Sequence, residues 1–241
     1  MISPEIWLLC GTAGTIAFIH TLLGPDHYLP FVALAKSRAW SPAKTMHVTL
    51  LCGSGHILGS VLLGFIGIYA SIELNALEWI EGWRGDIAAW ALVSCGLVYT
   101  AWGLRRSYSN KSHVHWHSHG GVRHSHLHKH ETSHAHVHSS ENTDNNRRSL
   151  IGWAIFIVFI LGPCEPLIPL LMFPAAKESV AGLVAVTAVF ALVTVLTMLV
   201  VVAVLVWGFQ PVRVLKMERF SDALAGCTIT LCGLSIILLG S

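Results

Sequence analysis

Six apolar stretches, each long enough to cross a lipid bilayer, run through this 241-residue chain. The hydrocarbon core of a bilayer needs about 20 apolar residues per helix, and the stretches fall near residues 6–23, 45–70, 86–104, 150–173, 179–206 and 222–240. Charged residues make up only 12% of the chain, against roughly 25% in a soluble domain. A soluble fold is therefore excluded, and we expect an all-α membrane protein with six transmembrane helices.

The positive charges of the chain lie almost entirely on one side of these spans. When the connections are assigned to alternate sides, all but two of the 15 Lys and Arg residues share a side, the exceptions being Arg84 and Lys177. Lys and Arg concentrate in cytoplasmic loops, so we expect the connection at 105–149 to be cytoplasmic and both termini to be non-cytoplasmic. No Lys or Arg precedes the first stretch, which we expect to remain as a membrane helix rather than to be cleaved as a signal peptide.

The first and fourth stretches contain related interruptions. Residues 23–27 read L-G-P-D-H and residues 161–165 read L-G-P-C-E, and a second Pro follows each. Proline breaks the hydrogen-bond ladder of a helix, and free backbone groups in a membrane must line a cavity or be buried against protein. Three spans separate the two copies, so the second enters the bilayer from the opposite side. We therefore expect two inverted three-helix repeats with broken first helices, 1–104 and 150–241, as in many transporters.

A small set of ionisable residues lies within the predicted membrane part. Such residues are costly in lipid and usually mark a pathway or a site. Imidazole nitrogens with a carboxylate suit borderline divalent metals such as nickel, cobalt or zinc. The candidate metal ligands are His20, Asp26, His27, His56, Cys164 and Glu165. His47 lies about half a helical turn out of phase with His56, by the helical period of 3.6 residues, and we expect it to be an ordinary helix residue.

These residues resemble the signature of a known family. His20, Asp26 and His27 are similar to the H-x4-D-H motif of the nickel/cobalt transporters (the NicO and urease-accessory UreH-type membrane proteins), with one more residue between the first His and the Asp here. Gly55-His56 resembles the second motif of that family, and residues 161–165 resemble its later L-G-acidic segment. The resemblance implies transport of nickel or cobalt, with metal recognised by His20, Asp26, His27 and His56. It also implies metallochaperones or the maturation proteins of urease or hydrogenase as partners.

An alternative function comes from the same interruption. The segment 161–169, with Pro163-Cys164, also resembles the Pro-Cys segment of the CcdA/DsbD transmembrane thiol-disulfide carriers, which have six spans in two inverted halves. Those proteins need a second Cys at the matching place in the first repeat, where this chain has Asp26-His27. None of the predicted membrane helices contains an H-E-x-x-H motif, so an intramembrane metallohydrolase is disfavoured. We expect no enzyme activity and no prosthetic group, with the metal as the transported ion.

The connection at 105–149 has a composition unlike the rest of the chain. It is polar and too poor in apolar residues to fold, so we expect a disordered loop. Near pH 7 most imidazoles are neutral lone-pair donors, so such a tract can bind several divalent ions weakly, which fits capture of incoming metal or delivery of outgoing metal. No basic patch interleaved with aromatic residues indicates a nucleic-acid partner. The histidines of this loop are His113, His115, His117, His119, His124, His126, His128, His130, His134, His136 and His138.

Overall fold

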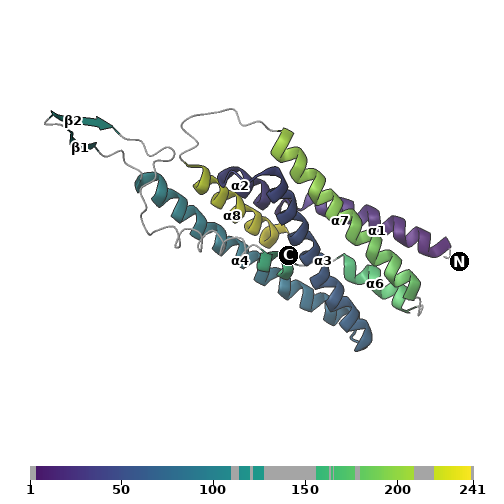
Figure 1. Ribbon diagram of the computed structural model, residues 1–241. Helices are drawn as coiled ribbons and strands as arrows, with labels where there is room; N and C mark the ends of the chain where they lie inside the picture. Colours follow the sequence, from purple (N-terminus) through teal and green to yellow (C-terminus); the bar gives the residue numbers. More distant parts are fainter. Residues whose placement is uncertain are drawn as a thin grey trace.

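The computed structural model describes residues 4–109, 114–119, 122–127, 156–162, 164, 166–176, 180–208 and 220–239. All of its long elements are helices (Figure 1). In chain order the helical elements are α1 (Pro4–Leu23), the 3-10 turn η1 (Pro25–His27), α2 (Leu29–Ser37), α3 (Pro42–Tyr69), α4 (Leu74–Ser109), α6 (Leu167–Ala176), α7 (Val180–Gly208) and α8 (Ser221–Leu239). Residues 156–161 are also helical and precede α6.

Five of these helices are long and apolar enough to cross a membrane, namely α1, α3, α4, α7 and α8. They confirm the prediction of an all-α, multi-pass membrane protein. The fourth predicted span, 150–173, is described only from residue 156, and there it consists of the helical residues 156–161, an interruption and α6. The remainder of that span lies outside the described residues.

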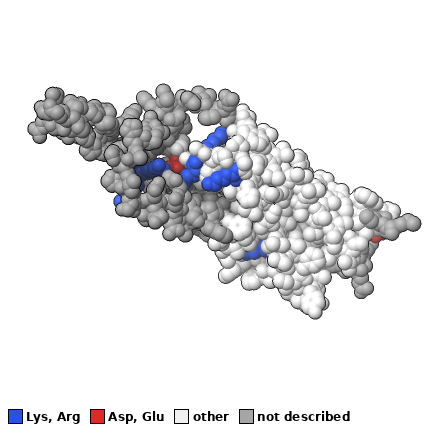
Figure 2. Space-filling view, in the orientation of Figure 1, with Lys and Arg blue, Asp and Glu red and all other residues white. Residues whose placement is uncertain are grey.

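The surface of the helices is that of a protein surrounded by lipid. Leu8, Leu58 and Leu231 are each more than half exposed, whereas a soluble protein rarely exposes large contiguous apolar patches. In Figure 2 the visible Lys and Arg gather mainly at the end of the molecule where α2 and the last turns of α4 lie, and most of the remaining face carries no charge. The apolar band matches the lipid-facing surface expected for spans of this composition.

The third span differs from its prediction, because α4 begins at Leu74 and not near residue 86. The added turns bury Leu77 and Glu81 completely and expose Trp79 and Trp83, and exposed Trp is typical of membrane–water interfaces. Arg84, which the charge count assigns to a connection, lies inside α4, and only 15% of its side chain is exposed. The hydropathy pattern places the start of the span too late because these charged residues face the protein.

Both predicted interruptions are present. In the first, the Gly24 N–H donates to His20 O at 3.0 Å, α1 ends, and the 3-10 turn η1 leads into α2. In the second, the Gly162 N–H donates to Phe159 O at 3.2 Å, and α6 begins five residues after Gly162 at Leu167. Each apolar segment is therefore divided at its Gly-Pro step into two helical pieces.

Helices from the two ends of the chain are interleaved. α1 lies beside α7 and α4 lies beside α8 (Figure 1), while α2 contacts α7 and α8, and α6 contacts α3 and α4. The α4–α8 pair is the closest, because Gly96 lies against the backbone of Thr230 and Gly226 lies against the backbone of Thr100. Small residues at such positions let two membrane helices approach closely.

Two short strands, β1 (Val114–His119) and β2 (Val122–Leu127), pair antiparallel within the histidine-rich connection. Figure 1 draws this hairpin beyond the last turn of α4. An isolated two-stranded hairpin is marginally stable in water, and the rest of the connection after Ser109 lies outside the described residues. The hairpin departs from the predicted disorder at residues 114–119 and 122–127, and the disorder of the rest of the loop stays a prediction.

Candidate metal site

Three of the predicted ligands meet at the first interruption. His20 lies in the last turn of α1, His27 lies in η1, and His56 lies in the middle of α3. One ligand nitrogen from each lies within 4.8 Å of the other two. The ring centroids of His20 and His27 are 4.9 Å apart, and those of His27 and His56 are 5.1 Å apart. His27 and His56 are each only 3% exposed, so this cluster lies in the interior of the protein.

The break after α1 brings His27 back towards His20. Two full α-helical turns separate residues seven apart by about 10 Å along the axis, which is too far for two imidazoles to meet. The helix ends at Leu23, and the His27 N–H donates to Gly24 O at 3.1 Å within the 3-10 turn. The interruption therefore lets the His27 ring approach the His20 ring, although six residues separate them in the sequence.

The third histidine reaches the cluster from the buried face of α3. Cys52, His56 and Ser60 are buried at helical spacing, whereas His47 is exposed, as predicted for an ordinary helix residue. A side chain at Gly59 would collide with the carbonyl of Ile160. The glycines of α3 therefore allow the segment 156–162 to pack directly against α3 beside His56.

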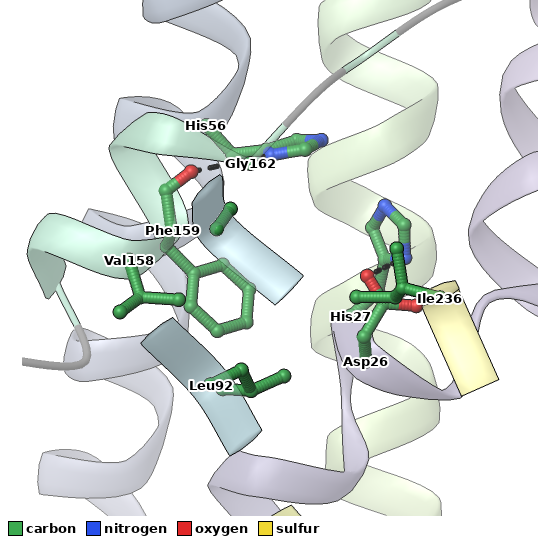
Figure 3. Close-up of a pocket in the computed structure, with 9 residues that line it drawn as sticks. Asp26, His27, His56, Leu92, Val158, Phe159, Gly162 and Ile236 are labelled. Carbon is green, nitrogen blue, oxygen red and sulfur yellow. Dashed lines mark hydrogen bonds and ion pairs between the residues drawn. The ribbon is translucent and has the colours of Figure 1, made fainter. Parts of the chain in front are cut away.

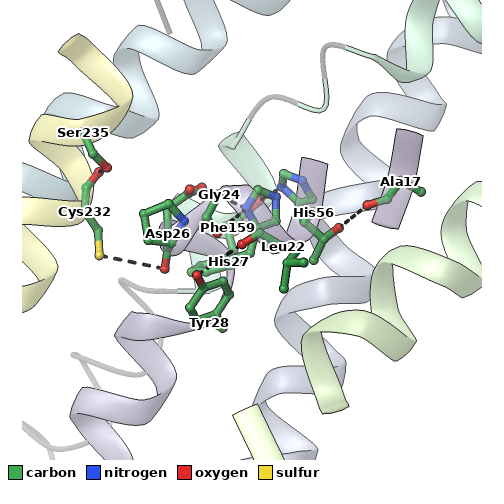
Figure 4. Close-up of polar contacts among 12 residues, drawn as sticks. Ala17, Leu22, Gly24, Asp26, His27, Tyr28, His56, Phe159, Cys232 and Ser235 are labelled. Atoms are coloured by element: carbon green, nitrogen blue, oxygen red, sulfur yellow. Dashed lines mark hydrogen bonds and ion pairs between the residues drawn. The ribbon is translucent and has the colours of Figure 1, made fainter. Parts of the chain in front are cut away.

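Two of the imidazoles are oriented by backbone and carboxylate oxygens (Figure 4). The His27 Nδ1 lies 3.2 Å from Gly24 O and 3.3 Å from Asp26 Oδ2, and the His56 Nδ1 lies 3.3 Å from Phe159 O. A carbonyl oxygen can only accept a hydrogen bond, so Nδ1 is the protonated nitrogen in both rings and Nε2 carries the lone pair. Metal-binding histidines are usually held in this way, with one nitrogen fixed by an oxygen and the other left for the metal.

The Nε2 atoms of all three histidines are buried and have no hydrogen-bond partner among the described residues. A buried polar group left without a partner costs about 1–3 kcal/mol, so a purely structural cluster would carry this cost three times. A cation between the rings would satisfy all three nitrogens at once.

A small cavity extends from the cluster between elements that are far apart in the sequence. Figure 3 shows His27 with Asp26 on one side and His56 with Phe159 on the other. The cavity is lined by Asp26, His27, His56, Ala88, Leu92, Val158, Phe159, Gly162 and Ile236. The site therefore lies where η1 and α3 meet α4, α8 and the helical segment before the second interruption.

The other predicted ligands do not join the three nitrogens. Asp26 is outside the group of donors within 4.8 Å, and its carboxylate lies instead against the His27 Nδ1. Cys164 is also outside this group, and it is fully buried in a cluster with Ala13 and Leu167. Glu165 lies outside the described residues. The 3-10 turn places the Asp26 carboxylate beside the Nδ1 atom of His27, where it can orient the imidazole ring.

The sequence analysis missed Ser60, Glu81 and Arg84, which form a polar cluster beside the second interruption. A signal was present, since Glu81 and Arg84 are spaced for an i,i+3 ion pair on a helix. The pair was obscured because Arg84 was assigned to a solvent-exposed connection. Comparison with known proteins adds no further guide: no protein-family model, no curated protein and no solved structure matches this chain.

Proposed function

We propose that this protein is a membrane transporter for a divalent transition-metal cation, with His20, His27 and His56 as its transient binding site. The observation that carries the proposal is the convergence of three histidines, each of which has a buried Nε2 atom without a hydrogen-bond partner among the described residues. Ionisable residues inside a membrane protein usually mark an ion pathway. Neutral nitrogen donors favour transition metals over magnesium or calcium, which bind oxygen.

The donor set suits a transported ion. Three protein ligands leave at least one position of a tetrahedral or larger coordination shell open to water or to an incoming ligand. An ion that must leave again has to be bound only moderately strongly. Three imidazoles are compatible with zinc, nickel and cobalt, and the preference for nickel or cobalt rests on the resemblance of His20, Asp26, His27 and Gly55-His56 to the nickel/cobalt transporter motifs.

The proposed mechanism is rocking of two inverted halves about the metal site. The helix contacts support it, since α2 of the first half contacts α7 and α8, and α6 of the second half contacts α3 and α4. The α4–α8 crossing supports it too. A Gly-x-x-x-Thr step in each helix places Gly96 against Thr230 and Gly226 against Thr100. Binding sites of inverted-repeat transporters lie at the interface of the repeats, where this cavity receives residues from both halves.

The charged end of the protein provides the proposed orientation. The Lys and Arg residues near α2 and the last turns of α4 belong on the cytoplasmic side, together with the histidine-rich loop that follows α4. The loop then concentrates metal close to the cytoplasmic mouth of the pathway. The partners implied by the resemblance, metallochaperones or maturation proteins of urease or hydrogenase, would exchange metal there.

The thiol-disulfide alternative has weaker support. Cys164 is fully buried among apolar side chains of α1 and α7, and the residue at the matching place in the first interruption is Asp26. Thiol exchange requires an accessible thiolate.

Metal flux into proteoliposomes tests the proposal. Purified protein should transport at least one of Ni²⁺, Co²⁺ and Zn²⁺, and His27→Ala should reduce the flux to the level of empty vesicles because it removes the central ligand. The matched control is His47→Ala, an exposed histidine of α3, which should transport normally. Full flux in the His27→Ala variant would refute the site. Loss of activity in Cys164→Ser, with His27→Ala fully active, would favour the thiol carrier.

A further inference from the structure

A buried ion pair lies one helical turn from the metal cavity on α4. Glu81 is completely buried, the side chain of Arg84 is 15% exposed, and Arg84 Nη2 lies 2.9 Å from Glu81 Oε2. Ala88, which lines the cavity, follows Arg84 by four residues, or about 6 Å along the helix. Charges within a membrane protein are costly unless they are paired or serve a function. The pair is therefore a candidate for a role at the neighbouring site.

Arg84 links three separate parts of the chain. In addition to its bond with Glu81 it donates to the Gly162 carbonyl at 3.0 Å and to the Ser60 hydroxyl of α3. Gly162 directly precedes the Pro that interrupts the fourth span, where the regular hydrogen-bond ladder ends. A free carbonyl at such a place needs a partner within the membrane, and Arg84 supplies it.

The segment that Arg84 holds is the one that orients His56. The Phe159 carbonyl lies 3.3 Å from the His56 Nδ1. The Gly162 backbone is so close that an added Cβ would lie 3.0 Å from the same nitrogen. Figure 3 shows Phe159 and Gly162 beside the His56 ring. A shift of the turn 159–162 would therefore rotate His56 and move its Nε2 away from His20 and His27.

We propose that Arg84, held by Glu81, is a positioning residue for the metal site. By fixing the turn 159–162 against α3, it keeps the His56 lone pair directed at the other two histidines. This inference rests on the proposed function, because it assigns a role at the same site. Loss of an oxygen or charge that orients a metal ligand typically weakens metal affinity about 10- to 100-fold.

Co²⁺ binding to the full-length protein tests the inference. The background is a chain whose eleven loop histidines are changed to Asn, so that visible absorption of bound Co²⁺ reports the membrane site alone. In this background Arg84→Gln should weaken Co²⁺ binding about 10- to 100-fold and change the absorption spectrum, because His56 leaves the coordination shell. The matched control is Arg106→Gln, since Arg106 also forms a 2.9 Å ion pair from α4, with Asp222, and is largely exposed away from the cavity. The control should bind Co²⁺ normally.

Two further variants separate position from charge and from folding. Arg84→Lys keeps a cation beside Glu81, but its shorter side chain does not carry the ammonium to the position of Nη2, which donates to the Ser60 hydroxyl and the Gly162 carbonyl. Co²⁺ binding should therefore remain weakened at an unchanged melting temperature. If Arg84→Gln does not fold, Ser60→Ala takes its place in the test. This variant removes one acceptor of Arg84 without disturbing the ion pair, and it should weaken Co²⁺ binding to a smaller extent. Wild-type Co²⁺ affinity and spectrum in Arg84→Lys would overturn the inference while leaving the proposed function intact. Absence of Co²⁺ binding in the background itself would instead overturn the proposed function, and this inference with it.

Discussion

Individual nitrogen atoms define the chemistry of the site. Both His27 and His56 are held through Nδ1 by oxygen atoms, so their Nε2 atoms are committed as lone-pair donors. Leaving each of these buried nitrogens without a partner costs about 1–3 kcal/mol. Bound metal should therefore stabilise the fold as well as fill the site, as any ligand that binds only the folded state does.

Asp26 provides a test of this arrangement. Asp26→Asn keeps an oxygen that can accept from the His27 Nδ1 but removes its charge, so metal binding should weaken about 10- to 100-fold without being abolished. Isothermal titration of the loop-substituted protein with Ni²⁺ measures this effect. Asp86→Asn, an exposed position on α4, is the control and should leave the affinity unchanged. If Asp26→Asn eliminated binding as completely as His27→Ala, the carboxylate would itself be a ligand.

At the scale of helices, the glycines of the α4–α8 pair set how closely the two halves approach. A side chain at Gly96 would collide with the backbone of Thr230, whereas a side chain at Gly82 of the same helix would meet nothing within 4 Å. The same residue type therefore has opposite consequences at two positions of one helix.

Substitution at these two glycines should change stability in opposite directions. Gly96→Val should destabilise the protein by about 1–3 kcal/mol, as expected for overpacking. Gly82→Ala should stabilise it by up to about 1 kcal/mol, because Ala favours the helix over Gly. Thermal unfolding in detergent, followed by circular dichroism, measures both. Equal melting temperatures for the two variants would show that the helices separate without cost at Gly96.

Helix positions were largely predictable, and the exception has a physical reason. Length and hydropathy are local properties, so α1, α3, α7 and α8 agree with their predicted ranges within a few residues. α4 does not, since its first turns contain Glu81 and Arg84. Whether such charges end a span or face a protein partner depends on the elements that pack beside them, and hydropathy carries no information about those partners.

For the whole molecule, the histidines divide into a buried cluster and a tract in the loop. The loop has no predicted fixed geometry, so its affinity for metal should follow the protonation of ordinary imidazoles, whose pKa is about 6.5 in model peptides. The buried cluster has fixed geometry and a fixed number of donors. The two populations should therefore respond differently to substitution and to pH.

Changing the eleven loop histidines to Asn should lower the number of Ni²⁺ ions bound per chain at about pH 7.5 and have little effect at about pH 5.5, where imidazoles are protonated and bind metal poorly. Flux at saturating metal should be unchanged, and flux at limiting metal should fall. Equilibrium dialysis and proteoliposome uptake measure the two quantities. A loss of flux at saturating metal as severe as that of His27→Ala would place the loop histidines on the pathway itself.

The sequence by itself determined the apolar spans, the two interruptions and the identity of His20, His27 and His56 as candidates. Hydrophobic length, Gly-Pro steps and ionisable residues in apolar stretches are all visible locally. The tertiary structure decided which atoms meet: that the Asp26 carboxylate lies against the His27 Nδ1, that Cys164 does not join the three histidines, and that Arg84 donates to the Gly162 carbonyl. These contacts depend on how α3, α4 and the segment 156–162 pack together, and no local pattern encodes the packing of segments so far apart in the chain.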